Sequence, residues 1–143
     1  MIREVKLVLL LLIVTALLWG TTPIIEKIGL ATVDPLVGVA VRSAIATAGL
    51  LILILLLGKG KSLMEVDGKG FLIFGASGVM AGLFGMWTYY TVLKAEPTSK
   101  IVPIAACYPL VTVLLGTLIL KEGVTISRLI GTVLIVSGIW LVK

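Results

Sequence analysis

The stretch LVLLLLIVTALLWGTTPII, residues Leu7–Ile25, decides the fold class because it runs for 19 residues without a charged side chain. A helix needs about 20 such residues to cross a hydrocarbon core roughly 30 Å thick. Basic Arg3 and Lys6 precede the run, and Glu26 follows it. We therefore predict a membrane-spanning helix. Because no small-x-small cleavage site follows, we expect this helix to be retained rather than removed as a signal peptide.

Four more apolar runs follow in the rest of the chain, and no polar stretch is long enough for a soluble domain. The chain is 59% hydrophobic and only 13% charged, against about 25% charged residues in a soluble domain. We predict an all-α integral membrane protein with five transmembrane helices in one domain, residues 1–143. The expected helices span about residues 7–27, 35–57, 70–93, 99–120 and 126–142.

The composition also excludes several kinds of chemistry. The chain has no histidine, one cysteine (Cys107) and seven carboxylates. Zinc sites, disulfide frameworks and most acid–base catalysis need His, paired Cys or clustered acids. We expect no metal, no cofactor, no enzymatic activity and no nucleic-acid partner.

Two helix boundaries are marked by capping signals. Asp34 before Pro35 is a typical helix start, because the Asp side chain accepts from unpaired backbone N–H groups. Proline is tolerated at the first helical position because its missing N–H is not needed there. Gly58, followed by Lys59, is expected to end the second helix.

The distribution of Lys and Arg predicts the orientation in the membrane. Seven basic residues fall on one side and four on the other, with Arg42 a fifth if it extends to that surface. The excess predicts a cytoplasmic amino terminus and an external carboxyl terminus; the small margin leaves insertion in both orientations open. The seven are Arg3, Lys6, Lys59, Lys61, Lys69, Lys121 and Arg128, and the four are Lys27, Lys94, Lys100 and Lys143.

Four motifs carry a resemblance to a known family. They are Ala16–Pro23 (ALLWGTTP) with Lys27 a turn later, Arg42 in the second run, Tyr108-Pro109-Leu110 leading to Leu120-Lys121-Glu122, and Gly131–Gly138 (GTVLIVSG). Their order and spacing resemble the EamA-domain family of the drug/metabolite transporter superfamily over nearly the whole chain.

The resemblance implies a transporter, an exporter or exchanger, that moves a small metabolite or drug-like solute across the cell membrane by alternating access. Members of this family commonly join two inverted five-helix repeats, whereas this chain holds one repeat. We therefore expect it to work as an antiparallel homodimer of single repeats, in contact with lipid, with a parallel arrangement as the alternative. The alternative is an accessory or assembly subunit that transports nothing itself and pairs with another membrane protein.

Arg42 is the one full charge expected deep in the bilayer, about 10 Å past the start of the second helix. A charge at that depth is a candidate for solute binding, and it favours an anionic or zwitterionic solute. The alternative is that the side chain extends to the headgroups. Its acidic partner should be Glu26, Asp34 or Glu96. Glu26 and Lys27 themselves are expected as a solvated pair at the interface.

The third run carries glycines on one helical face and aromatic residues near its end. Gly78 and Gly82 belong to a Gly-x-x-x-Gly pattern that lets membrane helices approach closely. We expect this face to pack against another helix, with direct contact to a solute as the alternative. The face consists of Gly75, Gly78, Gly82 and Gly85, and the aromatic residues Trp87, Tyr89 and Tyr90 are expected in an interfacial belt.

The expected solute site lies at the bilayer midplane. Pro109 falls about 15 Å into the fourth helix, where it deprives the carbonyl of Ala105 of its helical partner. Interrupted helices mark transporter sites, although a kink without a ligand is the alternative. With the resemblance added, the expected substrate-binding residues are Trp19, Gly20, Arg42, Gly78, Gly82, Tyr108 and Pro109.

The last helix is the candidate dimer interface. Gly131 and Gly138 are seven residues apart and share one face, with Leu134 and Ile135 between them. Small residues allow close approach of helices in lipid. The alternative is that this face packs within the same chain.

Overall fold

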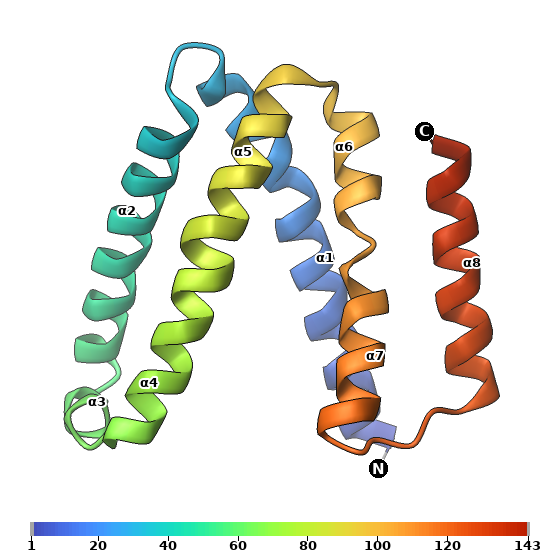
Figure 1. The fold of residues 1–143 in the computed structure, drawn as a ribbon. Helices are drawn as coiled ribbons and strands as arrows, with labels where there is room; N and C mark the ends of the chain where they lie inside the picture. The colour runs from blue at the N-terminus through green and yellow to red at the C-terminus, as the bar shows by residue number, and fades with distance from the viewer. Residues whose placement is uncertain (1, 143) are drawn as a thin grey trace. The chain divides into compact units, whose positions relative to one another are not determined.

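The computed structural model describes residues 2–142, and every regular element in that part of the chain is helical (Figure 1). Its internal contacts divide the chain into two compact units, residues 1–95 and 96–143. A single domain over residues 1–143 stays a prediction. Lys143, which the charge count uses, lies outside the described residues, as does the side chain of Arg3.

The first unit contains three long helical runs and one short helix. They are α1 (Ile2–Leu30), α2 (Pro35–Leu56), α3 (Gly60–Met64) and the continuous run of α4 (Gly68–Ser77), η1 (Gly78–Gly85) and α5 (Met86–Ala95). The run over residues 68–95 replaces the expected helix at 70–93, and α1 is longer at both ends than the expected 7–27. Helix α3 lies inside the loop predicted between the second and third helices.

Both predicted ends of α2 are confirmed. The Asp34 side chain accepts from Leu36 N at 2.9 Å and from Val37 N at 3.4 Å. At the other end, Gly58 has φ +66°, a left-handed conformation that glycine adopts without strain. The amide of Gly58 donates to the Leu55 carbonyl and that of Lys59 to the Ile54 carbonyl. This pair of bonds is the Schellman motif that ends helices at glycine.

The middle of the third run is a π-helix, which sequence analysis did not predict. Each turn of η1 is wider than an α-helical turn, since π-helices bond i to i+5. Gly85 fits this geometry, because a Cβ there would lie 3.1 Å from the backbone oxygen of Met80. Wide turns of this kind are frequent at functional sites.

The core of the first unit lies at one end, where α1 stops, α2 starts and α5 stops. Leu30, Val39, Tyr90 and Leu93 are buried there, Leu93 completely. Towards the opposite end α1 and α4 run apart (Figure 1). The expectation of Tyr90 in an interfacial aromatic belt is therefore wrong: the residue is only 3% exposed because it packs against Leu30 of α1 and Val39 of α2.

The second unit consists of one interrupted helical run, α6 (Thr98–Ala105) and α7 (Tyr108–Ile119), followed by α8 (Ile126–Val142). The expected helix at 99–120 is interrupted at Ala106–Cys107, and Pro109 lies in the first turn of α7. The predicted kink is therefore a full break in the helix. Proline explains it, because Pro109 cannot donate to the carbonyl of Ala105 and its ring clashes with that carbonyl.

The protein is a multi-pass membrane protein. Four helical runs are long and apolar enough to cross a bilayer: residues 4–30, 35–56, 68–95 and 98–119. The fifth, α8, has 17 residues, which is at the short end of the range for a spanning helix, about 17–25 residues. Most large apolar side chains on these helices are exposed, as expected where lipid rather than water surrounds them.

Candidate functional site

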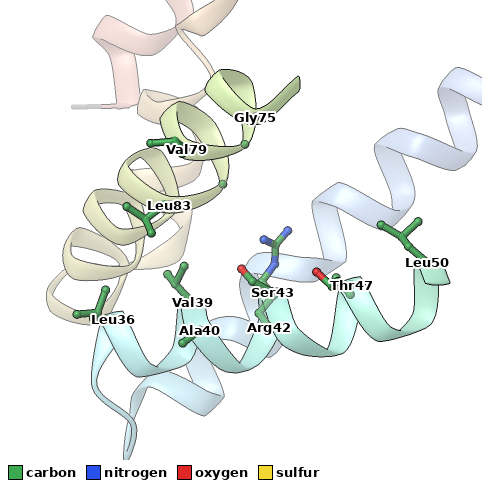
Figure 2. A pocket seen from close by; sticks show the side chains of 13 residues that line it. Leu36, Val39, Ala40, Arg42, Ser43, Thr47, Leu50, Gly75, Val79 and Leu83 are labelled. Atoms are coloured by element: carbon green, nitrogen blue, oxygen red, sulfur yellow. The ribbon is translucent and has the colours of Figure 1, made fainter. Parts of the chain in front are cut away.

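A groove of about 530 Å³ lies in the first unit between α2 and the α4–η1 segment. Small-molecule sites in proteins occupy about 300–1,000 Å³, so the space suits a small solute. The α2 wall consists of Leu36, Val39, Ala40, Arg42, Ser43, Ala46, Thr47 and Leu50, and the opposite wall of Gly75, Gly78, Val79, Gly82 and Leu83 (Figure 2).

The α2 wall carries the polar groups of the groove. Figure 2 shows the guanidinium of Arg42 and the hydroxyl oxygens of Ser43 and Thr47 on the side of α2 that faces it. Several hydroxyls elsewhere in these helices donate to their own helix backbone, as Thr22 does to Leu18 at 2.7 Å. Within the described part of the chain, Ser43 and Thr47 form no such bond. Their hydroxyls are therefore available to a ligand.

The opposite wall is mostly bare backbone. Gly75, Gly78 and Gly82 are three and four residues apart, so they share the face that lines the groove. A Cβ built on any of the three would meet nothing within 4 Å. The expected close packing of this face against another helix is thus not present within the described chain. Gly85 belongs to a different environment, against the Met80 carbonyl.

Arg42 is held from the side by Glu26 of α1. The Arg42 Nε lies 3.5 Å from Glu26 Oε1, and the Tyr90 hydroxyl donates to that same oxygen at 2.7 Å. Of the three expected acidic partners, Glu26 is therefore the one found, while Asp34 caps α2 and Glu96 pairs with Lys100. The Glu26 side chain is 9% exposed and that of Arg42 47%.

The expectation that Glu26 and Lys27 form a solvated pair is wrong. Glu26 is enclosed because α2 and α5 both contact it through charged or polar groups. Lys27 instead donates from Nζ to the carbonyls of Leu93 and Lys94, at 2.6 and 3.0 Å. A cation at the carboxyl end of α5 is favourable, because that end carries unpaired carbonyls and a partial negative charge.

Sequence reasoning missed Tyr90 and the role of Lys27 entirely. Both contacts depend on α5 meeting α1 at a sequence separation of more than 60 residues. The sequence offered one indication of these contacts: Glu26, Arg42 and Tyr90 are all expected towards the same membrane surface. Placing Tyr90 in an interfacial aromatic belt gave it no role in a contact between helices.

The other expected site residues are distributed as follows. Arg42, Gly78 and Gly82 line one groove. Trp19 is 66% exposed on α1 and does not line it, and a Cβ on Gly20 would meet nothing within 4 Å. Tyr108, 57% exposed, and Pro109 belong to the second unit.

The candidate dimer face lies on α8. Leu134 and Ile135 are 66% and 46% exposed. A Cβ on Gly131 or Gly138 would meet nothing within 4 Å, so no residue of the described chain is packed closely on these glycines. Among the described residues, no three His, Cys, Asp or Glu side chains gather as a metal site would need.

Residues 6–143 match the EamA-like transporter family. An uncharacterised protein of Methanocaldococcus jannaschii is 33% identical over 95 residues, which cover 66% of this chain and 69% of that protein. No solved structure gave a significant match.

Proposed function

Because the chain belongs to the EamA-like transporter family, we propose that it carries a small solute across the cell membrane by alternating access, and that the solute binds in the α2/α4–η1 groove. The observation that supports this most is the position of the groove. Its α2 wall extends from Leu36 to Leu50, about 21 Å of helix rise. Transporter sites lie near the midplane beside irregular helices, and η1 forms the opposite wall.

The working unit is a homodimer of single repeats. In one chain, a Cβ on Gly75, Gly78 or Gly82 would meet nothing within 4 Å, so the groove is open on this side. A second copy would enclose the solute and supply the second repeat that alternating access needs. The exposed face of α8, with Gly131 and Gly138, provides the contact between copies. The amino terminus is cytoplasmic in the majority of molecules.

An uptake screen on purified protein in liposomes tests this proposal. Amino acids, nucleosides, carboxylates and organic cations are offered as labelled solutes. We expect at least one class to accumulate, and Gly78→Leu to abolish its uptake by filling the groove. Gly49→Leu is the matched control, since Gly49 lies on α2 outside the groove with nothing within 4 Å of a Cβ. Folded protein that moves no solute alone would instead favour an accessory subunit.

A further inference from the structure

The groove has a mostly apolar lining and one cationic side chain, Arg42, whose hydrogen-bond donors are only partly used. Arginine has five N–H donors, and the Glu26 contact engages the Nε side at 3.5 Å. No residue in the described chain accepts from the two Nη groups. They project on the groove side of α2 (Figure 2).

The contact between Arg42 and Glu26 is also a loose one. Charge-assisted N–H···O bonds are about 2.7–2.9 Å long, and this one is 3.5 Å. Glu26 Oε1 is held more closely by the Tyr90 hydroxyl, at 2.7 Å. The guanidinium can therefore take a second acceptor without displacing Glu26 from Tyr90.

The other residues of the groove indicate which kind of solute carries the group that accepts from Arg42. Val79, Leu83 and Leu50 supply apolar surface, and the glycine wall allows a flat group to lie against the backbone. Ser43 and Thr47 add two hydroxyl donors along the same side as Arg42. The planar fork of Arg matches the geometry of a carboxylate, which it binds through two parallel hydrogen bonds.

We infer that the groove selects a small organic monoanion, a carboxylate on a flat apolar body, with Arg42 binding the carboxylate and Thr47 donating to it. This inference rests on the proposed function for the identity of the site. It assigns Arg42 to substrate selection, with Glu26 as the residue that keeps the guanidinium in place when no solute is bound.

Three probes that share one body test the charge requirement. Phenylpropionate, phenylpropanol and phenylpropylamine are titrated calorimetrically into protein in phosphatidylcholine nanodiscs, whose lipid carries no net charge. We expect phenylpropionate to bind at least tenfold more tightly than the other two. Tighter or equal binding of the amine would overturn the inference.

Two variants test the residues. Arg42→Gln is expected to weaken phenylpropionate binding by about tenfold or more, since hydrogen bonds to charged groups contribute about 1.5–3 kcal/mol. Arg128→Gln is the matched control, because Arg128 lies in the second unit and contacts the Gly123 carbonyl. If Arg42→Gln fails to fold, Thr47→Val keeps the shape and charge and is expected to weaken phenylpropionate binding by about tenfold, the loss of one hydrogen bond to a charged acceptor. Wild-type affinity in the folded variants overturns the inference.

A last arm separates a free solute from an anionic lipid. In nanodiscs that contain phosphatidylglycerol, at a salt concentration that screens the lipid charge, the affinity for phenylpropionate should equal that in phosphatidylcholine at the same salt concentration; a loss of affinity there would assign the anion site to lipid and overturn the solute assignment. Separate results test the inference about the anion and the proposal of transport. Protein that transports an amine and does not bind phenylpropionate contradicts the anion class alone, whereas protein that binds phenylpropionate and moves no solute contradicts the transport proposal.

Discussion

The hydroxyl of Tyr90 joins α5 to the carboxylate of α1 at a position where both side chains are largely enclosed. Tyr90→Phe removes this 2.7 Å bond and keeps the ring in the core. We expect a loss of about 1–3 kcal/mol in the free energy of unfolding, because a hydrogen bond to a charged acceptor is lost. Denaturant titration in detergent measures it. Tyr108→Phe, at an exposed tyrosine, is the control; equal effects of the two variants would contradict the role given to Tyr90.

Gly38 is the position on α2 where an added methyl group would contact the core closely. A Cβ there would lie 3.3 Å from Tyr90 Cε2 and 3.7 Å from Leu30 Cδ2. Gly38→Ala should therefore be less stable than Gly49→Ala by about 1–3 kcal/mol through overpacking, because both variants share the gain that alanine brings to a helix interior. Gly49→Ala, on the same helix with nothing within 4 Å, should unfold at or slightly above the wild-type midpoint. A Gly38→Ala protein as stable as Gly49→Ala would show that the contact is relieved at little cost.

The sequence predicts single residues where the deciding physics is local. Asp34 and Gly58 act on backbone groups within a few positions of themselves, and both roles could be predicted. The expected depth of each residue in the membrane limits the acidic partner of Arg42 to Glu26, Asp34 or Glu96. Glu26 could not be selected among them, because the choice depends on how α1, α2 and α5 meet.

The break between α6 and α7 belongs to the scale of the helix. Pro109→Ala restores an amide that can donate to the Ala105 carbonyl, so we expect the helix to continue through Ala106–Cys107. Hydrogen exchange over residues 105–110 should slow by about tenfold or more, which corresponds to about 1.4 kcal/mol of added protection at one closed bond. Mass spectrometry of peptides from this segment measures the rate.

Pro103→Ala is the matched variant for the break. Its restored amide faces the carbonyl of Ser99, within α6, and leaves Pro109 in place. Exchange over residues 105–110 should then stay at the wild-type rate. If the two variants behave alike, Pro109 is not the cause of the break.

Helix existence and order follow from the apolar runs, because lipid requires every backbone group to be paired within the helix. The π-helical geometry of η1 does not follow from them. A π-helix forms where each amide donates to the carbonyl five residues earlier instead of four. The glycines at 78, 82 and 85 are compatible with both patterns. The same run therefore looked like a packing face in sequence and forms a groove wall in the structure.

At the scale of the whole molecule, one repeat is expected to need a second copy. Leucine at both Gly131 and Gly138 should abolish the homodimer, because bulk on the bare face of α8 prevents close approach. Cross-linking in detergent, read as the dimer fraction, checks this. Gly49→Leu provides the control for added bulk elsewhere on the surface. A dimer fraction unchanged by the double substitution would show that α8 is not the interface.

The claim that a solute passes through the α2/α4–η1 groove is tested most directly by solute protection of a cysteine at Thr47. Thr47→Cys in a Cys107→Ser background is treated with a thiol reagent in liposomes, with and without the transported solute, beside Gly49→Cys as the control outside the groove. The solute should slow labelling at position 47 alone, and labelling there should stop uptake. Labelling at position 47 that the solute does not slow, with uptake continuing after modification, would contradict the account.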